Sequence, residues 1–289
     1  MTAILLVAVG LINNAVTTSG IANTFALMIA QWSQGSLLLA LTLITIASLV
    51  LGMGLPVTAA YIVLSILSAP ALAGMLADSV IVEQLVQGIS DPGVAAMFML
   101  VDPELPARLA TGIPEEQARE LLSTIPFDIS VALRPLIVDP AIMTTFLLTA
   151  HLIVFWLSQD SNVTPPVCLA AFTAAGIAGS KPMATGVEAW KIAKGLYIVP
   201  LLFAYTPMIG ADLPELLRIG IFSLAGIYAL NALLQRYSEG PIPWWGYPVF
   251  IIGAIGCFIP LNWVLNLAGT AAVGAMIFLS ARRQPLNVE

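Results

Sequence analysis

The chain has 289 residues, of which 59% are hydrophobic and only 9% are charged, and its formal net charge is −6. No charged side chain precedes Asp78, and a second charge-free run extends from Gly240 to Ala281. Because apolar runs of about 18 residues or more cross a bilayer, this composition excludes a soluble domain and predicts an all-α membrane protein with several spans. The negative charge lies mainly in one segment and gives no indication of a nucleic-acid partner.

The sequence carries little catalytic equipment. Met1 begins an apolar segment without a basic region or a small-residue cleavage site, so we expect no signal peptide. Cys168 and Cys257 fall in apolar segments, where packing is a more ordinary role than a disulfide. His151 is the only histidine, and no G-x-S-x-G, H-E-x-x-H or P-loop pattern occurs. We therefore expect neither an enzyme nor a primary pump, and no organic cofactor.

Residues 1–75 are predicted to contain a first span, an interfacial helix and a re-entrant hairpin. The interfacial helix is Ile21–Trp32, which is more amphipathic than its neighbours. The hairpin arms Ser36–Leu51 and Val57–Leu72 are short for a span, since a helix rises only about 1.5 Å per residue. The sequence Gly52-Met53-Gly54-Leu55-Pro56 separates the arms and is expected to form the tip of the hairpin.

Residues 76–139 form an acidic insert that we expect outside the membrane. The insert carries ten acidic and three basic residues. Glu115–Ile125 has the pattern of an amphipathic helix, and Pro114 stands at its first turn, where proline is favoured. The rest is expected to be loop and short helix. One hypothesis makes the insert a docking surface for a soluble partner, and the alternative is an ordinary solvated loop.

Residues 140–210 are predicted to form a discontinuous helix and the span that follows it, and residues 211–289 the C-terminal spans. The half-helices Ala141–Ser158 and Val167–Gly179 flank the break Ser161-Asn162-Val163-Thr164-Pro165-Pro166. Non-helical chain survives at membrane depth only inside protein or against a water-filled cavity. Two breaks in separate apolar segments therefore indicate the ion and substrate site of a secondary transporter.

The hairpin tip suits both a cation and an anion. Glycines allow close approach of the backbone, and Pro56 can begin a helix. Carbonyl groups that end the first arm suit Na⁺, whereas amide groups that begin the second arm suit a substrate carboxylate. We predict Gly52 and Gly54 as Na⁺ residues, and Pro56 and Thr58 as substrate contacts. A kinked span, in which glycine and proline only permit helix packing, remains an equal alternative.

The break between the half-helices is rich in oxygen ligands. Four side chains with oxygen atoms precede the two prolines, namely Asp160, Ser161, Asn162 and Thr164. Proline has no N–H, so Pro165 and Pro166 leave upstream carbonyl groups free for a hard cation. We predict Asn162, Thr164 and Pro165 as Na⁺ residues, Thr164 also as a substrate contact, and Asp160 and Ser161 as further site residues. An aspartate within a span is a functional candidate, and the alternative is a hydrated aspartate at the interface.

Three long motifs resemble the large permease of TRAP transporters. They are GMGLPVTAAYIVLS (Gly52–Ser65), SNVTPPVCLAAFTAAGIAG (Ser161–Gly179) and MATGVEAWKIAKGLYIVPLLFAYTP (Met183–Pro207). The nearest resemblance is to the fused permease type that works with TAXI-class periplasmic binding proteins. The resemblance covers most of the chain outside Leu76–Asp139, and the last two spans match more loosely.

The resemblance implies an ion-transporter-like elevator fold with two inverted repeats, each with a re-entrant hairpin and a broken helix. It also implies Na⁺ between hairpin tip and broken helix, and symport of carboxylates delivered by the TAXI-type binding protein. The tip glycines of the family correspond to Gly52 and Gly54, and its broken-helix motif to Thr164-Pro165-Pro166 with Asn162 upstream. The first repeat and the small membrane subunit are missing from the sequence. The chain thus resembles a second repeat, as a fragment or split subunit, and the missing parts are expected partners.

The positions of Lys and Arg predict the orientation in a bacterial inner membrane. If the hairpin is re-entrant, one face holds Lys181, Lys191, Lys194, Arg236, Arg282 and Arg283. That face is expected to be cytoplasmic, together with the C-terminus, and the acidic insert is then periplasmic.

Two alternatives to transport are considered. In the first, the chain is a membrane scaffold, a partner-binding half or a truncated fragment whose broken helices are vestigial. Replacing Gly54 or Thr164 would then leave uptake by the complete complex unchanged. The second, an intramembrane enzyme, is much less favoured for want of acid and base groups.

Overall fold

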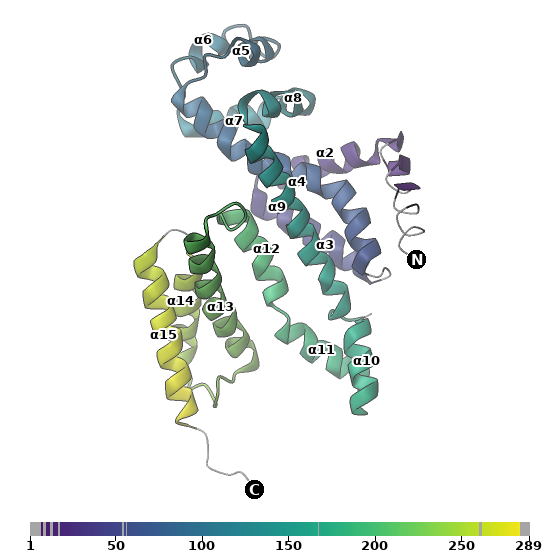
Figure 1. The fold of residues 1–289 in the computed structure, drawn as a ribbon, viewed down its shortest axis with the longest axis vertical. Helices are drawn as coiled ribbons and strands as arrows, with labels where there is room; N and C mark the ends of the chain where they lie inside the picture. The colour runs from purple at the N-terminus through teal and green to yellow at the C-terminus, as the bar shows by residue number, and fades with distance from the viewer. Residues whose placement is uncertain are drawn as a thin grey trace. The chain divides into compact units, whose positions relative to one another are not determined.

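The computed structural model describes residues 18–53, 55, 57–166, 168–259 and 262–283, together with residues 7, 10–11 and 14–16. Gly54 and Pro56, two predicted tip residues, lie outside the described residues. The described part is helical, and its only β pairing is an isolated bridge between Tyr237 and Pro241. Figure 1 shows the helices in chain order.

Contacts divide the chain into two compact units. Unit 1 comprises Met1–Val50 and Thr58–Ser158, and unit 2 comprises Leu51–Val57 and Gln159–Glu289. Among the described residues, four helices are long and apolar enough to cross a membrane: Val57–Gln87, Pro140–Asn162, Leu213–Gln235 and Trp263–Ala281. The protein is therefore an all-α membrane protein with several spans, as the composition predicts.

Unit 1 contains the predicted hairpin arms, the acidic insert and the first half of the broken helix. Its helices are α2 (Ile21–Ser33), α3 (Leu37–Gly52), α4 (Val57–Gln87), α5 (Pro92–Met99), α6 (Leu105–Leu109), α7 (Glu115–Thr124), α8 (Phe127–Ile137) and α9 (Pro140–Ser158). The amphipathic helix expected over Glu115–Ile125 is confirmed as α7, with Pro114 at its N-cap.

The second hairpin arm is longer than predicted. It was expected to end at Leu72, but α4 continues to Gln87 and tolerates Pro70 in its interior. The extension is helical because Ala77, Ile81 and Leu85 recur at helical spacing and bury one face. At about 1.5 Å per residue, α4 is long enough to cross a bilayer alone. The re-entrant course of the hairpin therefore remains a prediction.

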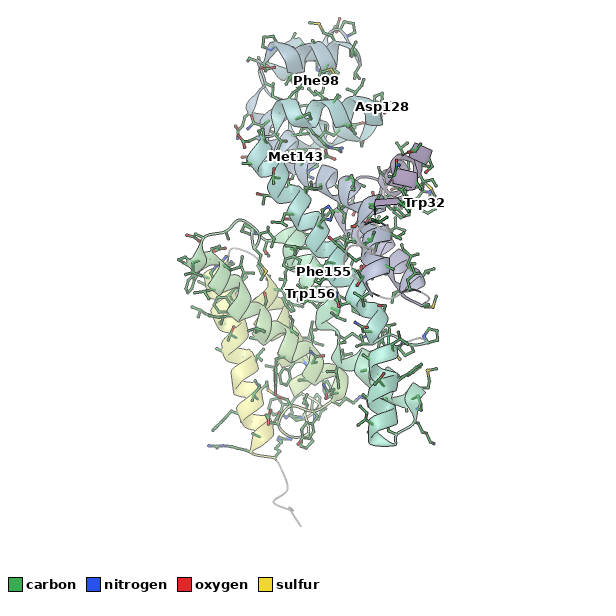
Figure 2. All side chains as sticks on the ribbon, turned by 45° about the vertical axis from the view of Figure 1, so that its right-hand side comes forward. Trp32, Phe98, Asp128, Met143, Phe155 and Trp156 are labelled. Carbon is green, nitrogen blue, oxygen red and sulfur yellow. The ribbon has the colours of Figure 1, made fainter. Side chains whose placement is uncertain are left out.

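The acidic insert folds around its own apolar core. The buried residues of this core include Leu85, Phe98, Leu109 and Leu133, which come from α4, α5, α6 and α8. Phe98 lies among these helices, and Met143 at the start of α9 packs against the same cluster (Figure 2). The insert is thus a small helical body with a core of its own, because its apolar side chains are sufficient to close one; loop and short helix are what the sequence predicts outside α7.

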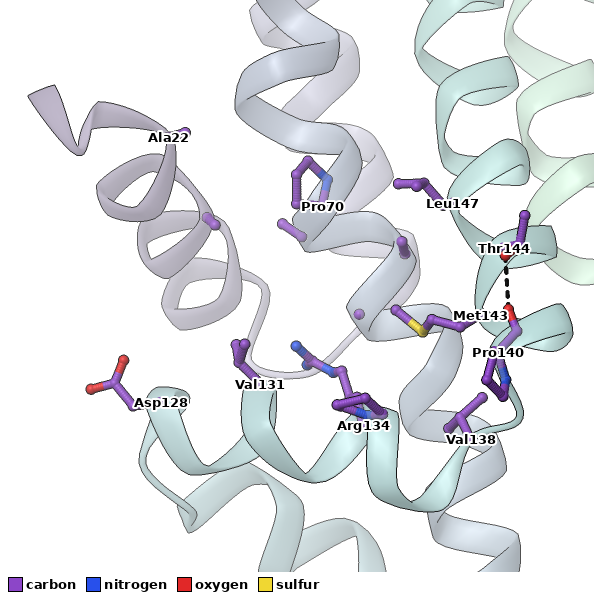
Figure 3. A pocket seen from close by; sticks show the side chains of 15 residues that line it. Ala22, Pro70, Asp128, Val131, Arg134, Val138, Pro140, Met143, Thr144 and Leu147 are labelled. Carbon is purple, nitrogen blue, oxygen red and sulfur yellow. Dashed lines mark hydrogen bonds between the residues drawn. The ribbon is translucent and has the colours of Figure 1, made fainter. Parts of the chain in front are cut away.

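A cavity of about 610 Å³ lies in unit 1 between α2, α4, α8 and α9. Its walls are mainly apolar, and Arg134 is the cationic group in them (Figure 3). The Arg134 guanidinium lies against Gly74 and binds both carboxylate oxygens of Asp78, at 3.1 and 3.2 Å. The charge of Arg134 is therefore already neutralised within the unit.

Unit 2 contains the hairpin tip, the second half of the broken helix and the C-terminal helices. Its helices are the 3₁₀ turn η1 (Gln159–Asn162), α10 (Leu169–Ala178), α11 (Pro182–Ile192), α12 (Gly195–Tyr205), α13 (Leu213–Gln235), α14 (Gly246–Phe258) and α15 (Trp263–Ala281). Helices α13, α14 and α15 pack together as a bundle. Gly269 of α15 lies so close to α14 that a Cβ atom there would come within 2.6 Å of the Gly253 carbonyl oxygen. Small residues of this kind allow membrane helices to pack closely.

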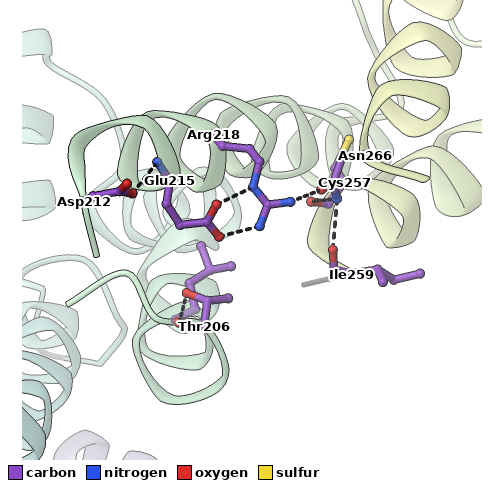
Figure 4. Close-up of polar contacts among 8 residues, drawn as sticks. Thr206, Asp212, Glu215, Arg218, Cys257, Ile259 and Asn266 are labelled. Carbon is purple, nitrogen blue, oxygen red and sulfur yellow. Dashed lines mark hydrogen bonds and ion pairs between the residues drawn. The ribbon is translucent and has the colours of Figure 1, made fainter. Parts of the chain in front are cut away.

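A buried polar cluster joins these three helices (Figure 4). Asn266 of α15 donates through Nδ2 to the carbonyl groups of Gly256, Cys257 and Ile259, which end α14, at 2.9, 3.2 and 3.0 Å. Its Oδ1 accepts a bond of 3.3 Å from Arg218 of α13, whose guanidinium also binds Glu215. Asn266 therefore caps the open carbonyl groups of α14 where water is excluded.

We predict that Asn266→Ala destabilises the C-terminal bundle by about 2 kcal/mol or more, because it leaves several buried polar groups without partners. The unfolding midpoint of the purified protein in detergent measures this loss. Asn231→Ala is the matched control, since the one hydrogen bond of the Asn231 side chain among the described residues goes to the carbonyl group of Ile227 in its own helix. Equal losses in the two variants would contradict the capping role.

Candidate functional site

The chain breaks its helix where the sequence predicts. Helix α9 ends at Ser158, η1 covers Gln159–Asn162, and α10 begins at Leu169. The Asp160 carbonyl group accepts the N–H groups of Val163 and Thr164, at 3.1 and 2.9 Å, and thereby closes a tight turn. Pro165 and Pro166 follow and cannot continue the ladder, because proline has no N–H.

Gly52, the first residue of the predicted hairpin tip, lies directly on this break. A Cβ atom added to Gly52 would come within 2.8 Å of the Ser161 Cβ and 3.3 Å of its Cα. Gly52 is buried, so only a residue without a side chain fits between the end of α3 and the turn. Two apolar breaks that are far apart in the sequence are thus in contact within unit 2.

Asp160 is the central acidic group of this contact region. The residue is 2% exposed. Its Oδ1 accepts hydrogen bonds from the Thr164 hydroxyl and, at 2.5 Å, from the Tyr197 hydroxyl. Its Oδ2 is buried and has no hydrogen-bond partner among the described residues. In this carboxylate, therefore, Oδ1 accepts two hydrogen bonds and Oδ2 accepts none from the described residues.

Burying a carboxylate oxygen that has no hydrogen-bond partner costs free energy unless a positive charge or a proton lies beside it. Lys194 acts on Asp160 electrostatically from a distance, but no lysine or arginine forms an ion pair with Asp160 in the described part of the chain. A hard cation such as Na⁺ takes carboxylate, hydroxyl and carbonyl oxygens. The break offers all three kinds of oxygen, so its chemistry fits a cation at Oδ2.

Helices α11 and α12 supply a second layer around the carboxylate. Trp190 of α11 donates its Nε1–H to the Tyr197 hydroxyl at 3.1 Å. The Lys194 ammonium group lies 3.0 Å from the centroid of the Trp190 ring. The sequence interpretation missed this group of Trp190, Lys194 and Tyr197, which we call the Tyr197 corner. The available signal was Tyr197, a side chain with a polar end in an apolar segment, which follows a lysine by three residues.

The remaining predicted residues have different surroundings. Asn162 is half-buried, and its side chain has no hydrogen bond in the described structure. Ser161 is half-buried beneath Gly52, and Pro165 packs against α11, where a Cβ on Gly186 would lie 3.4 Å from the proline Cγ. Thr58 is exposed in the first turn of α4, in unit 1.

The helices and the broken segment define an all-α membrane protein with several spans and one interrupted helix. The chain matches the family model of the DctM component of the tripartite ATP-independent periplasmic transporter over residues 1–209. It therefore belongs to this family of transporter permeases, and the resemblance to TRAP permeases is confirmed at that level. Comparisons with curated proteins and with solved structures gave no match. The matched range includes the hairpin tip, the break and the Tyr197 corner, whereas α13 to α15 lie beyond it.

We predict that Gly52→Ala destabilises the contact between tip and break by about 1–3 kcal/mol, because the added methyl group overlaps Ser161. The unfolding midpoint in detergent measures the effect. Gly274→Ala is the control, since nothing lies within 4 Å of a Cβ at that helical position. The control is expected to be neutral or slightly stabilising, because alanine favours a helix. A neutral Gly52→Ala would contradict the close packing of the tip.

Proposed function

We propose that this chain is the permease component of a Na⁺-coupled symporter that takes up an organic acid delivered by a periplasmic binding protein. The family makes the chain one component of a tripartite transporter that does not use ATP, so an ion gradient is the natural source of energy. The single observation that supports a coupling ion is the buried Asp160 carboxylate with its unpartnered Oδ2.

The proposed Na⁺ site combines Asp160 Oδ2 with oxygen atoms of the break and the tip. Gly52 and Ser161 are in contact there, and the half-buried Asn162 offers an amide oxygen. Gly54, Thr164 and Pro165 are the other proposed Na⁺ residues. A proton on Oδ2 would also remove the unpaired charge, so proton coupling is the alternative that an experiment must separate.

The substrate and its delivery follow from the family resemblance. We propose a carboxylate substrate, with Pro56, Thr58 and Thr164 as contacts, and a TAXI-type binding protein as the donor. The Thr164 hydroxyl already donates to Asp160, so a substrate contact would add to its role at the cation site. We propose further that a complementary permease half and a small membrane subunit complete the transporter, and that the C-terminus is cytoplasmic in a bacterial inner membrane.

We predict that Na⁺ stabilises the purified protein more than an equal concentration of K⁺, and that Asp160→Asn removes the difference. A ligand at 100 times its Kd stabilises the bound state by about 2.7 kcal/mol. The unfolding midpoint in NaCl and in KCl at neutral pH measures the effect, and Na⁺-gradient-driven uptake by the reconstituted complete transporter provides the functional readout.

Asp128→Asn is the matched control, because Asp128 is an exposed carboxylate on α8. It should keep the full Na⁺ effect. Stability that depends on pH but not on Na⁺ would favour proton coupling. A complex that transports equally well with Asp160→Asn would refute the cation site and favour the scaffold alternative.

The acidic insert is a candidate docking surface for the binding protein. Its core is closed, and α7 exposes Glu116 and Glu120 on its outer face. We predict that Glu116→Lys with Glu120→Lys weakens uptake at low salt by reducing the association rate, since opposite charges steer encounter. Uptake at several binding-protein concentrations measures this effect. Unchanged uptake would leave the insert as an ordinary solvated body.

A further inference from the structure

Tyr197 and Thr164 place two hydrogen-bond donors on the same carboxylate oxygen of Asp160. Thr164 lies in the break, four residues after Asp160, whereas Tyr197 comes from α12. Both donate to Oδ1, and neither reaches Oδ2. Because each carboxylate oxygen has about two lone-pair directions, two donors fill the capacity of Oδ1. Only Oδ2 is left for a ligand.

Trp190 fixes the direction in which the Tyr197 hydroxyl donates. An indole N–H can only donate, so its bond of 3.1 Å occupies an acceptor position of the phenol oxygen. The phenol proton is then directed to Asp160, at 2.5 Å. Lys194 over the Trp190 ring holds the indole by a cation–π contact. The corner thus orients the phenol without touching Oδ2.

We propose that Tyr197 is a positioning residue that makes Asp160 a ligand through one oxygen and thereby favours a monovalent over a divalent cation. This inference rests on the proposed cation site at Asp160. Ca²⁺ takes six to eight oxygen ligands, and carboxylates bind it through one or both oxygens. Because two donors occupy Oδ1, the carboxylate cannot bind an ion through both oxygens. A divalent ion therefore loses more binding free energy than Na⁺ does.

The test compares Tyr197→Phe with the unaltered full chain in detergent. For each cation, the concentration that gives half of the maximal thermal stabilisation is measured, with NaCl and CaCl₂ titrated separately at constant ionic strength. Without the Tyr197 bond the carboxylate is no longer held with Oδ2 toward the ion, so this loss of preorganisation is expected to raise the half-effective Na⁺ concentration about tenfold. The freed Oδ1 should lower the Ca²⁺ value or leave it unchanged, so the Na⁺ to Ca²⁺ ratio rises about tenfold or more.

Tyr205→Phe is the matched control in the same helix. The Tyr205 side chain is 47% exposed, and its hydroxyl has no hydrogen bond among the described residues. Both half-effective concentrations should stay at the values of the unaltered protein. A purely structural role for Tyr197 would move the Na⁺ and Ca²⁺ values by the same factor, so an unchanged ratio overturns the inference. Equal changes in the two tyrosine variants overturn it as well.

The outcomes separate this inference from the proposed function. If the unaltered protein shows no Na⁺ effect, the proposed cation site is refuted, and the proposed role of Tyr197 is refuted with it. If the Na⁺ effect is present but Tyr197→Phe keeps the ratio, only the positioning role falls. Should Tyr197→Phe fail to fold, Trp190→Phe removes the indole N–H that directs the Tyr197 hydroxyl toward Oδ1 and changes no proposed Na⁺ residue. The same rise in the ratio is expected there, and an unchanged ratio refutes the proposal.

Discussion

The rest of the site depends on one constraint, which is that a helix broken in an apolar environment must satisfy its polar groups within the protein. Asp160 meets this constraint twice. Its carbonyl group accepts two backbone N–H groups and closes the turn, while its Oδ1 accepts the hydroxyls of Thr164 and Tyr197. The same residue therefore shapes the break and leaves its buried Oδ2 without a hydrogen-bond partner among the described residues.

The carboxylates of Asp78 and Glu215 differ from that of Asp160 because each of them forms an ion pair with an arginine. Asp78 binds Arg134 through both oxygens, and Glu215 binds Arg218 in the same two-bond manner. The Asp78–Arg134 pair joins α4 to α8, whereas the Glu215–Arg218 pair lies within α13, and in each pair the carboxylate has a cationic partner. Asp160 has neutral donors on one oxygen and, in the described part of the chain, no hydrogen-bond partner on the other, which is an arrangement that a bound cation would complete.

Close packing gives the site its second element. Gly52 leaves room for the hairpin tip on Ser161, as Gly269 leaves room for α14 on α15. In the bundle this approach serves packing, and Asn266 caps the end of α14 beside it. At the break it brings Gly52 against Ser161, the residue that follows Asp160 in the chain. The same device thus supports stability in one region and the proposed ion site in the other.

The sequence by itself determined the class, the family and the position of the break, because apolar runs and the Thr164-Pro165-Pro166 motif act locally. It also predicted α7 from its amphipathic spacing. It did not predict that α4 continues past Leu72 or that the insert closes around Phe98, since both depend on contacts between separate helices. Only the tertiary structure decided that Gly52 meets Ser161 and that Tyr197 reaches Asp160. Residues so far apart in the chain share no periodicity, and packing alone selects which of them meet.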